Sequence, residues 1–269
     1  MKAYVFDVEF LWGFQSRVAG LSKSPSSYLF PPPTTVLGAL AERLARRLRY
    51  GERDGVRLIT ELSGDLIAIS FRPLNTFPIS YMTLARVIAM GQRGGVSYPT
   101  PREVYVYKSF DAPAKGSTLL GSIDGRPPRI RYFVIFKDCS KLRLDDIWAI
   151  RRIGSRESLV AVVDVWEAKI VRRDKEGFVI TAVPEDEGIT ILSDLSGAFR
   201  EYYVYPYALT DPPAKTQLMD PSRVKPFLIP VPEVSGLQNP LEVSTDEVKY
   251  TIYTLNYGKE EEKVVGLAT

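Results

Sequence analysis

The residues best suited to bind a ligand lie between positions 29 and 39, where the chain reads Leu-Phe-Pro-Pro-Pro-Thr-Thr-Val-Leu-Gly-Ala. Three consecutive prolines fix φ and keep the entry to a helix extended. Thr34 or Thr35 then offers a hydroxyl as the helix N-cap. Gly38 costs a helix roughly 1 kcal/mol relative to alanine, which indicates a close backbone approach. A helix start of this kind favours a phosphate ligand; a rigid packing turn without a ligand is the alternative.

A second polar segment, Arg-Ile-Gly-Ser-Arg-Glu-Ser-Leu, occupies positions 152–159. Gly154 is able to adopt a positive φ and end a helix, and Ser158 offers a hydroxyl group. Arg156 suits either a phosphate or the carboxylate of Glu157. The segment therefore reads either as a phosphate contact or as a helix-to-strand turn closed by an ion pair.

Two further segments carry side chains that suit RNA. Arg17, Lys23 and Ser24 precede the proline run in a loop that fits phosphate contacts, or is a plain surface loop. Residues 91–129 read as a protruding β-hairpin, with a strand at Val104–Phe110 and a turn around 113–116 before the strand Leu119–Ile123. Its aromatic and basic side chains suit single-stranded RNA; tyrosines packed against the core are the alternative. The candidate RNA contacts in this hairpin are Arg93, Gly94, Gly95, Arg102, Tyr105 and Lys108.

Composition excludes several kinds of site. The 269 residues contain no histidine and one cysteine, Cys139. Ser-His-Asp and Cys-His nucleophile pairs and a structural zinc site are therefore excluded, and we expect neither a metal nor a cofactor. No stretch reads as a membrane span or a secretory signal, and no internal disulfide is possible, so we expect a cytoplasmic protein.

The charge distribution points to a polyanionic partner. Residues 1–135 hold 18 Lys and Arg against 10 Asp and Glu, whereas residues 136–269 hold 17 against 22. Arginine, the better residue for bidentate phosphate contacts, outnumbers lysine 22 to 13. A basic N-terminal half suits a polyanion, although chance asymmetry of a folded surface is the alternative. The composition also fits a heat-adapted source.

The elements that position these segments are mostly strands. Helices are predicted at Thr35–Tyr50 and Leu144–Arg152, with a weaker one at Met82–Met90. The acidic runs Glu185–Glu187 and Glu260–Glu262 read as solvated faces. Strands are predicted at Ala3–Trp12, Leu66–Phe71, Ile130–Phe136, Leu159–Val171, Phe178–Val183, Tyr202–Tyr207 and Val248–Leu255. The order is compatible with an α+β protein built on a ferredoxin-like, RNA-recognition-type core.

The proline-threonine-glycine run and the segment 152–159 together resemble one family of CRISPR-associated proteins. It is the fifth-subunit family of archaeal type I-A Cascade, within the RAMP superfamily. The resemblance implies a ferredoxin-like domain over 1–183, including the hairpin at about 91–129, and a smaller β-rich region over 184–269.

The resemblance also implies a function. The chain would be a non-catalytic subunit in antiviral defence that binds the 5′ handle of the CRISPR RNA (crRNA) and caps the backbone filament. Its partners would be that handle, the repeated backbone subunit and the large subunit, with target DNA reached through the complex. Two alternatives remain, a metal-independent repeat-RNA endoribonuclease using Tyr105 and Lys108, and a structural adaptor that binds little RNA.

Overall fold

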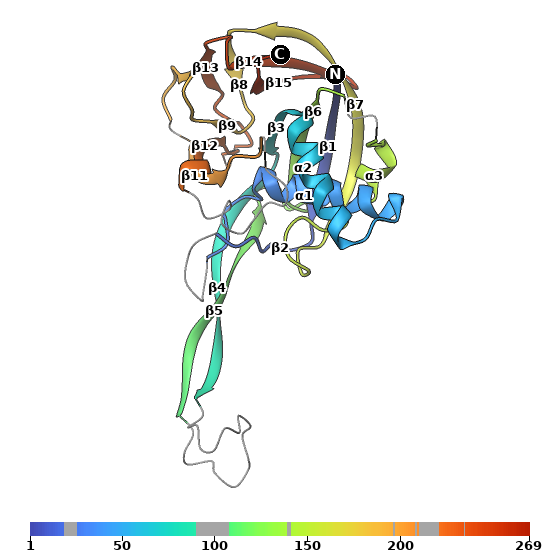
Figure 1. The fold of residues 1–269 in the computed structure, drawn as a ribbon. Coiled ribbons are helices and arrows are strands. Elements are labelled where there is room, and N and C mark those ends of the chain that lie inside the picture. Colours follow the sequence, from blue (N-terminus) through green and yellow to red (C-terminus); the bar gives the residue numbers. More distant parts are fainter. Residues whose placement is uncertain are drawn as a thin grey trace.

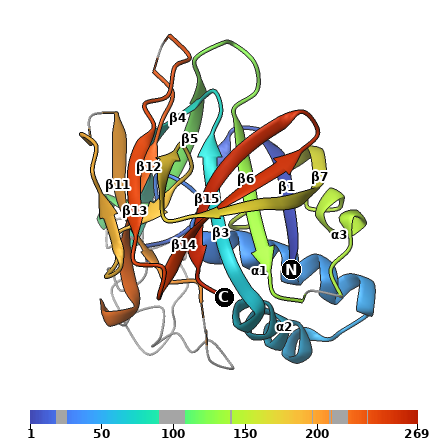
Figure 2. The ribbon, with the colours of Figure 1, turned by 90° about the horizontal axis from the view of Figure 1, so that it is seen from above.

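The computed structural model describes residues 1–18, 26–89, 108–138, 141–195, 197–207, 209, 221–233 and 235–269 (Figures 1 and 2). Six antiparallel strands form its main sheet, in the order β15-β14-β7-β1-β6-β3. Successive side chains of a strand point to opposite faces, so β1 sends Phe6 into one core cluster and Val5 into another. The strands are β1 (Lys2–Phe10), β3 (Leu66–Pro73), β6 (Arg129–Phe136), β7 (Val160–Asp174), β14 (Tyr250–Tyr257) and β15 (Glu260–Leu267).

The main sheet curls until its outer strands β15 and β3 lie against each other (Figure 2). Gly266 on β15 permits this approach. A Cβ atom at that position would stand 2.7 Å from the Cβ of Ala68 and 2.8 Å from the carbonyl oxygen of Ile67. Any side chain there would push the two strands apart.

Helices α1 (Pro33–Leu48) and α2 (Glu52–Asp65) lie together on one side of the main sheet (Figure 2). The predicted helix at Thr35–Tyr50 is confirmed as α1, and Leu37, Leu40 and Leu44 of its apolar stripe are fully buried. Helix α2 was not predicted, because its glycines and charged residues weaken the helical signal. The predicted helix that starts at Leu144 is confirmed as α3 but is shorter, Leu144–Trp148.

The predicted N-cap of α1 is wrong. Pro32 holds the cap position and no side chain caps the helix, so Thr34 and Thr35 already lie in its first turn. The backbone N–H of Thr35 donates to the Pro32 carbonyl at 2.9 Å. Pro33 stands at the first helical position, where the missing N–H of a proline costs nothing.

A long β-hairpin projects from the body of the molecule (Figure 1). Its strands β4 (Thr76–Ala89) and β5 (Lys108–Ser122) are paired from Thr76 and Ser122 to Ala89 and Lys108. The short strand β2 (Gly13–Phe14) pairs with β5 at the base. The sequence correctly indicated a protruding hairpin but misplaced it.

Two hairpin predictions are corrected. Met82–Ala89 belongs to strand β4, so the helix predicted there is wrong. The stretch 113–116 lies inside β5 and is not a turn. Its proline suggested a turn, yet Pro113 pairs with Leu84 directly beside the register shift, where position 114 lies unpaired between the partners of Thr83 and Leu84. A proline, which lacks an N–H to donate, is tolerated at such a bulge.

The C-terminal region is rich in strands, as expected. Two small sheets have the orders β10-β13-β8 and β11-β12-β9, and the last strands β14 and β15 extend the main sheet. The domain division at residues 183 and 184 stays a prediction. The strands of the small sheets are β8 (Glu176–Val179), β9 (Val183–Pro184), β10 (Ile189–Ile191), β11 (Ala198–Val204), β12 (Val224–Pro230) and β13 (Leu241–Thr245).

The acidic run at 260–262 is not a solvated face throughout. The side chain of Glu262 is only 4% exposed, and its Oε1 accepts from Arg72 at 2.7 Å and from Arg131 at 3.2 Å. Arg131 also binds Asp7 through two nitrogens, at 2.6 and 2.9 Å. Buried charges need such partners, so this cluster stabilises the sheet on the side away from α1.

Candidate nucleic-acid interface

Two adjoining hollows lie beside the N-terminal half of α1. The first, of about 610 Å³, is lined by residues 15–17, Thr35 and residues 154–157. The second, of about 430 Å³, shares Thr35 and residues 154–156 and adds Gly38, Ala39, Glu42 and Arg152. The proline-threonine-glycine run and the segment 152–159, far apart in sequence, therefore form one surface. We call these two hollows the α1 cradle.

The loop at 154–158 is held tightly against the end of β2. The backbone N–H of Gln15 donates to Ser158 Oγ at 2.9 Å, and the N–H of Ser155 donates to the Gln15 carbonyl at 2.9 Å. Gly154 has a φ of +122°, and a Cβ there would stand 2.7 Å from Ser158 Oγ. Ser158 is fully buried, so the prediction that it exposes its hydroxyl to RNA is wrong; it fixes the loop instead.

Gln15 also ties the α1 cradle to the base of the hairpin. Its side-chain amide donates to the Gly116 carbonyl at 3.1 Å and to Ser117 Oγ at 3.2 Å. Both acceptors lie on β5. The backbone of Gln15 thus holds the loop at 154–158, and its side chain holds the hairpin base, so a single residue joins the two.

The first turns of α1 present small groups to the α1 cradle. The hydroxyls of Thr35 and Ser16 are 3.2 Å apart. A Cβ added at Gly38 would meet nothing within 4 Å. Close packing of a neighbouring strand therefore does not explain this glycine. Whether the turn binds a ligand stays a prediction.

The segment that leads into α1 is fixed by an acid from the C-terminal region. Glu201 on β11 accepts the backbone N–H of Leu29 at 2.6 Å and that of Phe30 at 3.0 Å. The hydroxyl of Tyr203 donates to the same carboxylate at 2.5 Å. Burial raises the pKa of Glu201 above its ordinary value. Backbone N–H groups away from water need hydrogen-bond acceptors, and these two N–H groups obtain theirs from Glu201 on β11. The prolines that follow have no N–H group to satisfy.

The α1 cradle carries an excess of positive charge. Arg17 and Arg156 line it, as does Arg152. Within the described part of the chain, no ion pair or hydrogen bond of these three side chains is present. In particular, Arg156 does not pair with Glu157, whose carboxylate accepts from Ser155 Oγ at 2.8 Å. Unpaired guanidinium groups of this kind suit phosphate oxygens.

A second group of arginines continues this charge along α1. Burial lowers the pKa of Arg43, and the nearby cations Arg46, Arg151 and Arg152 lower it further, although Glu42 opposes them. Glu42 forms an ion pair with Arg43 at 3.0 Å and another with Arg46. One carboxylate thus faces several guanidinium groups, and an added anion would be favourable here.

The predicted site residues fall into three groups. The structure brings Arg17, Thr35, Gly38 and Arg156 together in the α1 cradle, whereas Thr34 is half-buried beside it and does not line it. Lys108 opens β5, where only the backbone course is described. The remaining predicted contacts lie outside the described residues: Lys23, Ser24, Arg93, Gly94, Gly95, Arg102 and Tyr105.

Sequence reasoning missed Gln15, Ser16 and Glu42 as lining residues. Gln15 and Ser16 carried no motif signal, because their position depends on the pairing of β2 with β5. Glu42 follows the run at 29–39 and was not chosen as a lining residue. Arg152 stood at the start of the second segment but was not chosen as a contact.

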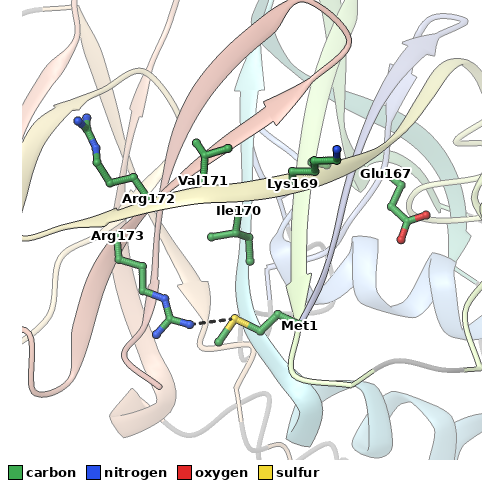
Figure 3. A pocket seen from close by; sticks show the side chains of 8 residues that line it. Met1, Glu167, Lys169, Ile170, Val171, Arg172 and Arg173 are labelled. Carbon is green, nitrogen blue, oxygen red and sulfur yellow. Dashed lines mark hydrogen bonds between the residues drawn. The ribbon is translucent and has the colours of Figure 1, made fainter.

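A further hollow, of about 940 Å³, lies along β7 between residues 167 and 173 and includes Met1 (Figure 3). Arg173 donates to the sulfur of Met1 at 3.4 Å, and its guanidinium lies 5.4 Å from the centre of the Tyr253 ring. The residues of the two sequence motifs do not line this hollow. It is therefore a weaker candidate than the α1 cradle.

Across the described ranges, no group of three or more His, Cys, Asp or Glu side chains is arranged to hold a metal ion. The helices that can be traced there are all too short or too polar to cross a membrane.

Comparison with known proteins identifies the family. No family model matches the chain. A crystal structure of a CRISPR protein from Archaeoglobus fulgidus aligns over 100% of both chains, with 33% identity and a TM-score of 0.73. The CRISPR-associated protein Cas5 2 of Saccharolobus solfataricus is 25% identical over 180 residues, which is 65% of this chain and 65% of that protein, slightly less than two thirds of each.

A chain of a Type III-B Cmr-beta complex bound to cognate target RNA also matches. It is 12% identical over 61% of this chain and 59% of that one, with a TM-score of 0.34, a likeness too weak to carry an argument. The full-length match to the Archaeoglobus protein and the match to Cas5 agree with the two motifs and with the mixed, mostly β fold. The chain therefore belongs to the CRISPR-associated RAMP proteins, in the Cas5 family.

Proposed function

We propose that this chain is a non-catalytic RNA-binding subunit of a type I-A CRISPR interference complex, and that it holds the 5′ handle of the crRNA in the α1 cradle. The observation that carries the proposal is the convergence of Arg17, Arg152 and Arg156, unpaired with any described residue, on a hollow beside the start of α1. RNA is a polyanion and therefore suits a surface with unpaired arginines.

The α1 cradle offers three kinds of contact to a single-stranded RNA. The arginines suit phosphate oxygens. The start of α1 carries partial positive charge, and no acidic residue lies in its first turn to cancel it. The hydroxyls of Ser16 and Thr35 suit a ribose 2′-hydroxyl, which distinguishes RNA from DNA. Gly38 leaves open space for a ribose or phosphate to approach the helix backbone.

A ferredoxin-like core is part of this proposal. The strands β7-β1-β6-β3 lie side by side in that order. Helices α1 and α2 follow β1, and α3 lies between β6 and β7. This is a β-α-β-β-α-β arrangement with the β4-β5 hairpin inserted between its second and third strands. The hairpin would act as a thumb on the RNA, and the body would cap the filament of repeated backbone subunits beside the large subunit.

The proposal of a non-catalytic role rests on side-chain chemistry. The chain has no imidazole to act as a base near neutral pH. Unperturbed tyrosine and lysine titrate far above neutrality. The α1 cradle itself contains arginines, hydroxyls and carboxylates, which suit binding and positioning of RNA.

A binding and cleavage assay with labelled RNA separates the three functions. Purified protein should bind the 5′ handle and leave full repeat RNA intact, with or without divalent metal. Site-specific cleavage that Tyr105→Phe or Lys108→Ala abolishes would establish the endoribonuclease instead. Absence of handle binding, with binding to the protein subunits retained, would establish the adaptor.

A further inference from the structure

The end of α3 and the residues that follow it expose a tryptophan and an arginine. Ile147, Ile150 and Ile153 are buried at a spacing of three residues. Trp148 and Arg151, also three apart, are exposed between them. The Trp148 side chain is 47% exposed. An exposed aromatic ring is a group on which a nucleic-acid base is able to stack.

The Trp148 ring has no described aromatic or hydrogen-bonding partner. Within the described ranges, no ring contact or hydrogen bond of its indole group is present. The other two tryptophans differ. Trp12 donates its ring N–H to the Glu157 carbonyl at 2.9 Å, and Trp166 packs against Tyr257 at 5.4 Å between ring centres. Of the three, Trp148 alone presents a ring without a described partner.

Two arginines follow Trp148 along the chain toward the α1 cradle. Arg152 lines the α1 cradle, and Arg151 precedes it. Both lie close enough to Arg43, in the middle of α1, to disfavour its charge. Helices α1 and α3 are fixed to each other by Arg47, whose Nε donates to Asp146 at 2.7 Å.

We propose that Trp148 is a stacking platform for a base of the single-stranded RNA segment that leaves the α1 cradle, with Arg151 and Arg152 meeting the phosphates on the way. Aromatic rings accept any base by stacking, and arginines follow the backbone. The proposal rests on the proposed function, since it extends the path of the same RNA. The platform would extend the length of RNA that contacts the subunit. It would do so without selecting a particular base sequence.

The charges around Trp148 favour RNA over a protein partner. The side chains of Arg151 and Arg152 form no ion pair or hydrogen bond with any described residue. Glu42, which lines the α1 cradle together with Arg152, is already shared by two arginines. A protein interface built around a tryptophan draws on apolar neighbours, whereas a nucleic-acid surface combines aromatic rings with unpaired cations.

The test compares Trp148→Leu with Trp148→Phe on RNAs of two lengths. One RNA carries the full handle and its adjoining nucleotides, and the other is shortened until the affinity of the wild-type protein begins to fall. Leucine keeps the apolar side chain but removes the ring, whereas phenylalanine keeps a ring. Trp148→Leu should weaken binding of the long RNA at least about fivefold, the lower end for one lost stacked base. Trp148→Phe should bind nearly as well as the wild type.

The short RNA and tryptophan fluorescence complete the test. The short RNA should bind Trp148→Leu and the wild type equally, and long RNA should quench the wild-type fluorescence more than that of Trp148→Phe. Equal affinity of Trp148→Leu and the wild type for the long RNA, while Arg17→Ala binds it more weakly, would overturn the platform and leave the proposed function intact. Loss of assembly with protein subunits in Trp148→Leu, with RNA affinity unchanged, would assign the ring to a protein interface. No RNA binding by the wild type would instead overturn the proposed function.

Discussion

Glu201 and Leu29 are joined by a 2.6 Å hydrogen bond in which the backbone N–H of Leu29 donates to the buried carboxylate. The bond spans 172 positions of sequence and links β11 to the residues just before α1. The C-terminal region thereby holds the segment that leads into the α1 cradle. Glu201 does not line either hollow, so its contribution to the proposed RNA binding would be positional.

The first prediction concerns Glu201→Gln. Burial raises the pKa of Glu201 above its ordinary 4.5 in the folded protein. At pH values between the ordinary pKa and the raised pKa, the native state binds more protons than the unfolded state. The free energy of unfolding therefore falls as pH rises. The variant lacks this titration. The stability of the wild type relative to the variant should therefore decrease from pH 4 to pH 7, by at most about 1.4 kcal/mol per pH unit.

Denaturant unfolding of both proteins at several pH values measures this difference, and ionisation of other groups cancels between them. A stability difference that is constant with pH, or that rises with pH, would show that the carboxylate does not titrate as its burial requires.

The second prediction concerns Gly38→Ala. The new methyl group meets no atom within 4 Å, so the free energy of unfolding should hold or rise by up to about 1 kcal/mol. The methyl would occupy the second hollow, and handle affinity should fall. Gly55→Ala in α2 is the matched control, because its methyl would make only ordinary contact, 3.5 Å from the Cβ of Ala45. The control should leave RNA affinity unchanged. Equal handle affinity for wild type and Gly38→Ala would remove this position from the RNA site.

The third prediction concerns the buried charge cluster. Arg131→Ala leaves the buried carboxylate of Asp7 without its main partner and leaves Glu262 with Arg72, which should cost about 3–5 kcal/mol of stability. Lys141→Ala is the control, since its ion pair with Glu61 is about half exposed on both sides and should be worth less than about 1 kcal/mol. Thermal unfolding compares the two. Similar losses of stability in both variants would show that the buried cluster around Arg131 does not stabilise the main sheet more than an exposed ion pair does.

Much of the fold could be read from the sequence, because local patterns determine it. The apolar stripe of α1 and the β-branched runs of β1, β6 and β7 gave nearly correct elements. The proline at 113 misled, because its turn propensity is overridden by the long pairing of β4 with β5. The prediction that Glu262 is solvated was also wrong, because its burial depends on Arg72 and Arg131, which come from distant strands.

The candidate site was only partly predictable. Gly38 and Gly154 could be identified from the sequence, because a glycine at a helix start or in a turn indicates a position that a side chain would disturb. The burial of Ser158 and the position of Gln15 had no local signal, since each depends on the other across 143 positions. Trp148 was also missed, because exposure of an aromatic side chain follows from the packing of the isoleucines around it.

The salt dependence of handle binding tests the central claim most directly. In the double variant Arg17→Ala and Arg156→Ala, two phosphate contacts are lost. The slope of log affinity against log salt should decrease in magnitude by about 1.4, at about 0.7 per contact on a single strand. Arg172→Ala, an exposed arginine at the far end of β7 that pairs with Asp174 at 2.9 Å, should retain the wild-type slope. A double variant whose slope and affinity equal those of the wild type would contradict the assignment of the α1 cradle as the RNA site.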